Sequence, residues 1–376
     1  MNAIPLSLYV HFPWCVAKCS YCDFNSHALA GELPEAKYID ALIRDFDEEI
    51  DGEDRPYLTS IFFGGGTPSL FSSLAFDQLL HAIRGRFDIS DTEVTIEANP
   101  GTFDQSNFEG YYDAGINRIS IGAQSFSDLH LQKLGRFHQS DDITSAVSGA
   151  KYAGFNRINL DLMYGLPGQS AREALTDLER AITLEPDHLS WYQLTIEPNT
   201  YFFSNPPATP QDDTLAEIMD LGFSLLEQAG FRQYEVSAFA RPGSEARHNL
   251  NYWQFGDYLG VGAGAHGKTS RDGKIIRTTK NRIPKDYLEN RRRRETPVER
   301  DELALEFLMN ALRLSDGFSF ELFEERTGLS QQVLVPFLDQ ASDKGLISTK
   351  AKSVRTTQLG SRFLNELLLL IDMPDR

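Results

Sequence analysis

The sequence predicts an α/β protein, a partial (β/α)6 barrel followed by a small, mainly helical C-terminal domain. Up to about residue 200, short apolar runs alternate with amphipathic stretches, which is typical of parallel strands joined by helices. After about residue 298 the pattern changes to helices with one short β-like run. A chain of 376 residues is long enough for a barrel-like domain and a smaller one.

The predicted barrel strands are short and nearly continuously apolar, and we expect them at residues 6–12, 60–63, 93–97, 118–122, 157–163 and 188–196. Amphipathic helices are expected between them at 35–50, 73–86, 104–114, 140–153 and 171–183. Six such units predict an open, partial barrel. In barrels of this kind the reacting groups come from the C-terminal ends of the strands, so the candidate site is expected there.

Three parts are expected along the chain: the partial barrel at 1–205, a barrel-completing and linker region at 206–297, and the C-terminal domain at 298–376. Prolines at 206, 207 and 210 indicate the first boundary, and a helix at 214–229 and a strand at 231–239 follow. In the last part, helices at 300–314, 320–327, 334–344 and 357–371 and a β-like run at 346–349 resemble a winged helix. Without a dense basic helix, an interaction or substrate-covering role is expected rather than DNA binding.

The net charge of −18 argues against nucleic acid as a partner, because nucleic-acid binding needs a basic surface. No apolar segment approaches the ~20 residues that cross a bilayer, and the N-terminus resembles no signal peptide, so we expect a cytoplasmic protein and no integral membrane segment. One basic run, the four arginines at 291–294, is read as a solvated helix end or linker. The alternative is a docking patch for an acidic partner or a membrane surface.

All three cysteines, Cys15, Cys19 and Cys22, lie within eight residues at the spacing C-x3-C-x2-C. Thiolates are the usual protein ligands of iron–sulfur clusters, so three of them would hold three irons of a [4Fe–4S] cluster and leave one iron open. Three structural cysteines, or a zinc site completed by His11 or His27, are the alternatives. Zinc sites usually show paired cysteine knuckles, so the cluster is favoured. The spacing resembles that of radical-SAM proteins, in which the open iron binds S-adenosylmethionine.

Polar residues recur after successive predicted strands. Gly65 lies in the run GGGTPS, where glycines let the backbone approach a ligand closely. Glu97 is placed to bond ribose hydroxyls, and the amide of Gln124 and the carboxylate of Asp161 follow at the same barrel mouth. Arg136, expected in the next helix region, offers forked donors for a carboxylate. Each of these residues, taken alone, is explained equally well as an ordinary polar residue that faces solvent. Their recurrence at successive strand ends indicates one site.

A later motif, H-N-x-x-Y-W, joins His248 to Tyr252 and Trp253. Imidazole is a standard axial ligand of haem iron and flat aromatic rings suit a porphyrin face. The alternative is simple packing where a loop joins the barrel. The glycine-dense run at 257–267 lacks the surroundings of a dinucleotide site, and a close backbone approach explains it better.

The runs YVHFPWC from Tyr9, GGGTP, IEANP, GAQSF and DLMYGLP together resemble the oxygen-independent coproporphyrinogen oxidase family over nearly the whole chain. The resemblance implies a radical-SAM partial barrel whose cluster is held by Cys15, Cys19 and Cys22. It places the following residues at positions that bind S-adenosylmethionine: Tyr9, Gly65, Glu97, Gln124, Arg136 and Asp161. It places Tyr21, Gly66 and Thr67 at positions that contact a second such molecule in the oxidase.

Two branches of that family differ in ways that bear on function. The oxidase carries an extra N-terminal segment and a further cysteine two residues after the third cluster ligand, where this chain has Phe24. The haem-chaperone branch starts close to the cluster and carries H-N-x-x-Y-W, which residues 248–253 match fully. The resemblance therefore implies a haem chaperone that lacks the oxidase activity, with His248 as a haem ligand.

Such a chaperone would receive haem from a donor protein and pass it to haem proteins, including subunits of the respiratory membrane. It would reach that membrane peripherally, through its partners. The second interpretation is an oxygen-independent coproporphyrinogen III dehydrogenase, which decarboxylates propionates with a 5′-deoxyadenosyl radical. The third is a zinc-stabilised interaction protein.

Overall fold

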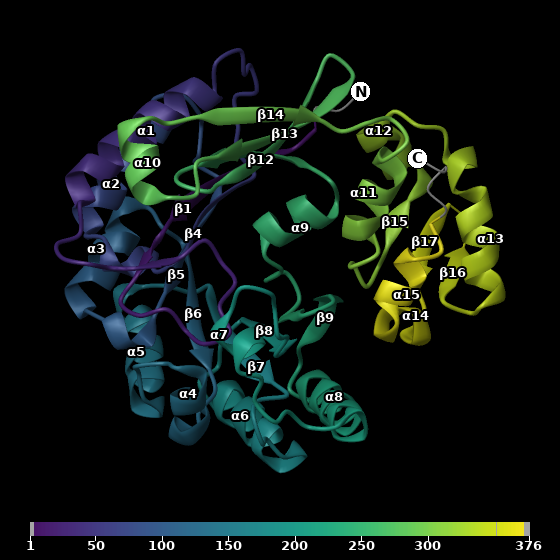
Figure 1. Ribbon diagram of the computed structural model, residues 1–376, viewed down its shortest axis with the longest axis horizontal. Helices are drawn as coiled ribbons and strands as arrows, with labels where there is room; N and C mark the ends of the chain where they lie inside the picture. Colours follow the sequence, from purple (N-terminus) through teal and green to yellow (C-terminus); the bar gives the residue numbers. More distant parts are fainter. Residues whose placement is uncertain (1–3, 351, 372–376) are drawn as a thin grey trace.

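A curved 12-stranded sheet is the largest feature of the computed structural model, which describes residues 4–350 and 352–371 (Figure 1). The strand order is β14-β13-β12-β11-β1-β4-β5-β6-β7-β8-β10-β9. The six strands expected from the sequence are central and pair in parallel in chain order. They are β1 (Leu6–Phe12), β4 (Ser60–Gly65), β5 (Glu93–Ala98), β6 (Arg118–Gln124), β7 (Ile158–Tyr164) and β8 (His188–Gln193). The predicted partial barrel is confirmed.

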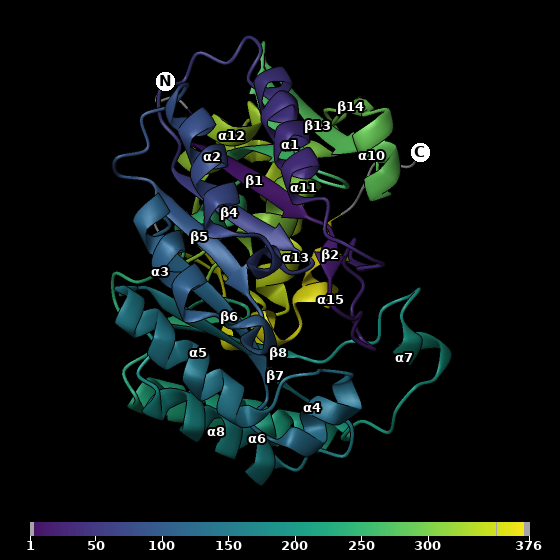
Figure 2. The same ribbon diagram turned by 90° about the vertical axis from the view of Figure 1, so that its left-hand side faces the viewer.

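Helices cover the convex face of these strands (Figures 1 and 2). They are α1 (Glu35–Glu49), α2 (Ser73–Arg84), α3 (Gln105–Ala114), α4 (Asp128–Leu134), α5 (Ser140–Ala153) and α6 (Ala171–Thr183). Several begin at a side chain that accepts a hydrogen bond from the first turn, as Ser72, Asp104 and Ser170 do. The 3₁₀ helices η1 (Pro68–Leu70) and η2 (Pro100–Thr102) follow β4 and β5.

Further strands extend the sheet at both edges. β11 (Asp257–Val261) pairs in parallel with β1, and β12 (His266–Arg271), β13 (Lys274–Lys280) and β14 (Arg293–Pro297) follow in antiparallel order. At the other edge the expected single strand at 231–239 is two strands, β9 (Arg232–Glu235) and β10 (Ala238–Ala240), which pair with each other. β12–β14 were not predicted, since they are polar and lack a clear apolar alternation. The helices of this region are α7 (Tyr201–Ser204), α8 (Asp212–Gln228), α9 (Arg247–Trp253) and α10 (Pro284–Glu289).

The arginine run at 291–294 leads from the end of α10 into β14, and Arg292, Arg293 and Arg294 are exposed, so the expected solvated linker is only part of the picture. Arg293 begins β14, and its Nε lies 2.7 Å from a carboxylate oxygen of Glu49. Arg291 lies 3.5 Å from Asp45 and also pairs with Glu48. All three carboxylates belong to α1, so two of the four arginines tie the sheet edge to this helix.

The C-terminal domain has its own apolar core, to which Phe255 and Ile275 of the preceding region contribute. Its elements are α11 (Leu303–Ala311), β15 (Phe318–Ser319), α12 (Phe320–Thr327), η3 (Gln331–Leu334), α13 (Val335–Asp343), β16 (Ile347–Lys350), β17 (Ser353–Thr356), α14 (Gln358–Arg362) and α15 (Leu364–Leu368). The helix expected at 357–371 is interrupted at Phe363. The divisions at 206 and 298 stay predictions, and residues 1–3 and 372–376 of the outer parts lie outside the described residues.

α9 carries the H-N-x-x-Y-W motif on the concave side of the sheet (Figure 1). It contacts β1, β4 and β11 on one side and α11 of the C-terminal domain on the other. A loop at this place was one alternative from the sequence; the motif instead begins in the first turn of a helix. Within the described residues no helix is both long and apolar enough to span a membrane.

Candidate functional site

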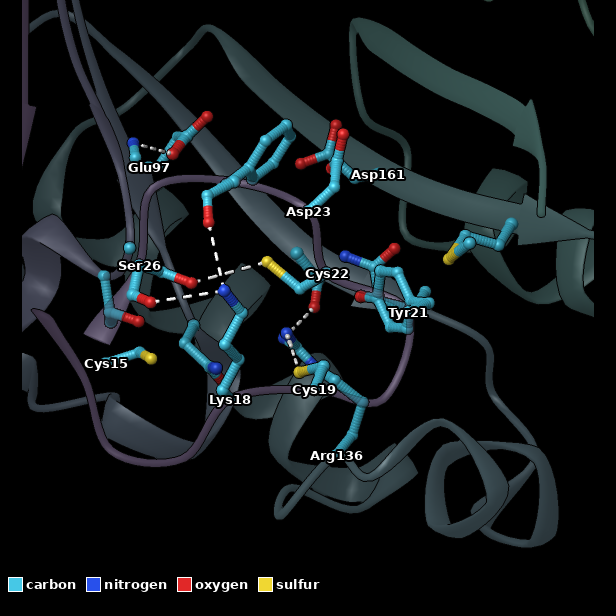
Figure 3. Close-up of a pocket in the computed structure, with 18 of the residues that line it drawn as sticks. Cys15, Lys18, Cys19, Tyr21, Cys22, Asp23, Ser26, Glu97, Arg136 and Asp161 are labelled. Carbon is cyan, nitrogen blue, oxygen red and sulfur yellow. Dashed lines mark hydrogen bonds between the residues drawn. The ribbon is translucent and has the colours of Figure 1, made fainter. Parts of the chain in front are cut away.

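The three cysteines lie in one loop that follows β1 (Figure 3). Cys15 ends β2 (Trp14–Cys15), which pairs in parallel with β3 (His27–Ala28), and the connection between these strands carries Cys19 and Cys22. Cys15 is buried, the other two are partly buried, and all three are free. They line a cavity of about 340 Å³, the cysteine cavity, together with Tyr21, Gly65, Gly66, Thr67, Glu97, Gln124, Arg136 and Asp161.

The chemistry of these thiols fits a cluster. Burial raises the pKa of the Cys15 and Cys22 thiols, so their thiolates need a bound cation. Arg136 Nη1 donates to Cys19 Sγ at 3.6 Å. Among the described residues, no three Cys, His, Asp or Glu side chains come close enough to hold a single metal ion. In a [4Fe–4S] cluster each thiolate binds a different iron, so three thiols spread around one cavity suit it better than they suit zinc.

The histidines considered as zinc ligands are placed poorly for that role. His11 Nε2 donates to the Asn25 carbonyl at 2.9 Å, and Nδ1 accepts from the Tyr9 hydroxyl at 2.8 Å. Burial lowers the pKa of His11 to about 4, so the ring is neutral with both nitrogens used. His27 does not line the cysteine cavity. Neither His11 nor His27 is therefore placed to complete a zinc site with the three cysteines.

The glycine run after β4 packs against the strand that leads to the cysteines. Gly65 has φ +119°, and a Cβ there would lie 2.5 Å from the His11 ring. A Cβ on Gly66 would lie 2.5 Å from the Trp14 carbonyl oxygen. The buried Thr67 donates its amide to the same oxygen at 2.7 Å. Only glycine suits the first two positions, which keeps the backbone exposed to the cavity.

Two partly buried carboxylates, one on β5 and one on β7, line the cysteine cavity. Glu97, on β5, accepts the Gly65 amide at 2.9 Å; burial and then the nearby Asp161 raise its pKa to about 8. Asp161, on β7, accepts from Ser120 and from Asn159 Nδ2, and burial raises its pKa. Neither carboxylate forms an ion pair among the described residues, so both are available to hydroxyl or cationic donors of a ligand.

Two further polar side chains, those of Arg136 and Gln124, line the same cavity. Arg136 donates Nη2 to the Gly122 carbonyl at 2.7 Å, while its buried Nε has no partner among the described residues. Gln124, with φ +67°, accepts the Tyr192 hydroxyl at 2.7 Å. Arg136 follows α4 after Gly135 and does not lie within a helix, so that part of the expectation was wrong. A buried, unpartnered guanidinium nitrogen is suited to a ligand carboxylate.

Tyr9 is the one expected cofactor residue that does not line the cysteine cavity. It lines a second space of about 650 Å³, the α9 cavity, which shares Phe24, Gly65 and Glu97 with the first. Aromatic side chains dominate its wall, and the basic groups His266, Lys268, Arg277 and Arg282 join them. The aromatic set is Tyr9, Phe24, Phe62, Tyr252, Trp253, Phe255 and Tyr258. This lining suits a large, flat, apolar molecule that also carries negative groups.

His248 lines the α9 cavity from the first turn of α9. Its Nδ1 donates to Glu93 Oε1 at 3.2 Å, and the ring centres of His248 and Phe62 lie 4.3 Å apart. Nε2 has no hydrogen-bond partner among the described residues, so one lone pair is available in the cavity. Glu93 begins β5, at the opposite end of the strand from Glu97. The rule that site residues lie at the C-terminal ends of barrel strands therefore did not identify it.

A third, polar space of about 190 Å³ lies between the other two, and Glu97 lines all three. From Asp161, hydrogen bonds lead through Asn159 to His188 Nδ1 (2.6 Å) and from His188 Nε2 to Tyr234 (2.8 Å). Burial lowers the pKa of His188 well below its usual value, so the ring is neutral. Asn249 of α9 donates to the Tyr234 hydroxyl at 3.0 Å. The cysteine side and α9 are thus joined by ordered polar groups.

Comparisons with protein families agree with this architecture. The radical SAM superfamily model matches residues 9–181, and the HemN C-terminal domain model matches residues 298–363. Among solved structures, coproporphyrinogen III oxidase (HemN) from Escherichia coli superposes with a TM-score of 0.83 over 98% of this chain and 90% of that chain, at 22% identity. That similarity shows a common fold.

Curated relatives align over nearly the full length. "Heme chaperone HemW" of Escherichia coli is 50% identical over 369 residues, which cover 97% of this chain and 98% of that protein. The Bacillus subtilis protein of the same name is 34% identical, with 96% and 97% covered. The mitochondrial "Radical S-adenosyl methionine domain-containing protein 1" of Bos taurus is 36% identical, with 96% and 86% covered.

Proposed function

The chain belongs to the family of the haem chaperone HemW, and from this membership we propose that it binds haem and delivers it to haem proteins. Its resident cofactors are a [4Fe–4S] cluster and S-adenosylmethionine. The observation that carries the proposal is the pair of adjacent cavities, one lined by three cysteines and one by aromatic rings around His248. One chain thus holds a cofactor site and a porphyrin-sized cargo site with a common wall.

In the cysteine cavity, Cys15, Cys19 and Cys22 would hold the [4Fe–4S] cluster, whose remaining iron would be open to S-adenosylmethionine. The unpartnered Nε of Arg136 supports a carboxylate contact, and Glu97 supports a contact with hydroxyl donors. The full proposed set of cofactor contacts is Tyr9, Gly65, Glu97, Gln124, Arg136 and Asp161, with Tyr21, Gly66 and Thr67 toward a second molecule. Tyr9 reaches the cofactor only from the α9 side of the wall.

In the α9 cavity, His248 Nε2 ligates the haem iron and the aromatic side chains pack on the porphyrin. Arg282, whose side chain has no partner among the described residues, lies at the rim and pairs with a porphyrin carboxylate. Lys268 and Arg277 are less suited to this, because Asp257 and Glu306 already pair with them. Haem would therefore enter with its carboxylates toward Arg282.

The test is a haem titration of the anaerobically reconstituted protein, followed by the Soret band. We expect stoichiometric binding by wild type and altered ligation with weaker binding by His248→Ala. His81→Ala, on the exposed surface of α2, is the matched control and should bind as wild type does. If wild type binds no haem and instead consumes coproporphyrinogen with S-adenosylmethionine and a reductant, the chaperone proposal fails and the dehydrogenase replaces it.

The proposed partners are haem itself, a haem donor protein and haem-accepting proteins, including respiratory membrane subunits. Peripheral contact with the membrane would run through such a partner, and the protein itself would be cytoplasmic. Co-purification of the haem-loaded chain with isolated membranes, compared with the haem-free His248→Ala variant, tests this. Equal recovery of both forms in the membrane fraction would contradict a cargo-dependent contact.

A further inference from the structure

A single buried carboxylate, that of Glu93, holds both the start of α9 and the ring of His248. Oε1 accepts hydrogen bonds from the amide of Arg247 at 2.8 Å, the amide of His248 at 3.3 Å and His248 Nδ1 at 3.2 Å. Oε2 accepts from Arg118 Nε at 3.0 Å. The Glu93 side chain is only 4% exposed and the Arg118 side chain 1%, so water does not compete for these bonds.

This arrangement determines which nitrogen of His248 can act as a ligand. Both oxygens of Glu93 already accept hydrogen bonds, Oε1 from the Arg247 and His248 amides and Oε2 from Arg118 Nε. Because neither oxygen is a donor in these bonds, the proton of the imidazole is kept on Nδ1. Nε2 is left with its lone pair and with no hydrogen-bond partner among the described residues, and the residue lines both the α9 cavity and the smaller polar space. Phe62, 4.3 Å from the ring centre of His248, restrains the ring on its other side.

We propose that Glu93 is the positioning residue for haem ligation: it orients His248, selects the tautomer with Nε2 free, and strengthens Nε2 as a donor to iron through the bond at Nδ1. This rests on the proposed function, in which His248 is the haem ligand. A carboxylate behind a metal-binding histidine usually raises its basicity, and losing it costs about 10–100-fold in metal affinity. Arg118 in turn fixes Glu93, and among the described residues it forms no hydrogen bond with His248.

The first test measures haem in Glu93→Gln, in the full-length chain with its cluster reconstituted. We expect haem to dissociate about 10–100-fold faster than from wild type and the ferrous iron–histidine stretching frequency to fall. Glu235→Gln is the matched control, since Glu235 is also buried beside an arginine but lies outside the α9 cavity. Unchanged dissociation and an unchanged frequency in folded Glu93→Gln would overturn the inference.

The second test needs no variant and so does not depend on folding of Glu93→Gln. In haem-free wild type labelled with ¹⁵N-histidine, His248 should show a protonated Nδ1 and an unprotonated Nε2, assigned by comparison with His248→Ala. The opposite tautomer would overturn the inference. If His248→Ala binds haem with a wild-type spectrum, the proposed haem ligand itself is wrong; if only Glu93→Gln behaves as wild type, the ligand stands and the positioning role falls.

Discussion

Replacing Lys280 by methionine should destabilise the fold, because its ammonium group joins the extended sheet edge to α1. Lys280 ends β13, is fully buried, and lies 2.5 Å from carboxylate oxygens of both Asp45 and Glu49. Asp45 also accepts the Tyr287 hydroxyl at 2.7 Å. The change removes the central cation and leaves two carboxylates in an apolar interior.

The magnitude follows from what remains around those carboxylates. Breaking a buried ion pair on one side costs about 3–5 kcal/mol, because the other charge stays buried and uncompensated. Arg293 still pairs with Glu49, and Arg291 lies 3.5 Å from Asp45. These arginines offset part of the loss, so we expect the lower end, about 3 kcal/mol.

Urea denaturation of the cluster-free protein, followed by far-ultraviolet circular dichroism, measures this change. Arg86→Met is the control: Arg86 pairs with Asp47 of the same helix at 3.3 Å, but both side chains are about half exposed. That variant should cost less than about 1 kcal/mol. A cost below about 1 kcal/mol for Lys280→Met as well would refute the reasoning, since the buried pair would then behave like a surface pair.

Three further outcomes are expected. The pKa of Glu97 is raised to about 8, so between about pH 4.5 and 8 the native state holds a proton that the unfolded state has lost, and the stability of the fold decreases as the pH rises. Glu97→Gln should flatten this decrease in thermal melts of the cluster-free protein. An unchanged slope in the variant would contradict the prediction. Gly65→Ala should abolish S-adenosylmethionine binding in equilibrium dialysis, since its Cβ meets the His11 ring, whereas Gly31→Ala, also at positive φ but in open space, should bind normally. Arg136→Gln should weaken S-adenosylmethionine binding about 10–150-fold in calorimetry, because one hydrogen bond from a charged group is lost. Wild-type affinity in the variant would exclude the contact between Arg136 and the cofactor carboxylate.

The sequence by itself determined the central sheet and half of the candidate site. Parallel strands buried on both faces are apolar throughout, so the six central strands could be found within a few residues. Because the C-terminal ends of parallel strands meet at one edge, Gly65, Glu97, Gln124 and Asp161 could be placed around one cavity together with the contiguous cysteines. These inferences rest on local patterns and one topological rule.

Only the tertiary structure decided the surroundings of α9. Glu93 and His248 are 155 residues apart, and nothing local distinguishes Glu93 from an ordinary strand-start residue. The arginines at 291 and 293 looked solvated because their partners lie on α1, more than two hundred residues earlier. Tyr9, which the family resemblance assigned to S-adenosylmethionine, lines the α9 cavity and not the cysteine cavity, and Gly65 and Glu97 line both. Ion pairs and shared cavity walls form between segments that folding brings together, so their partners leave no periodic signal in the chain.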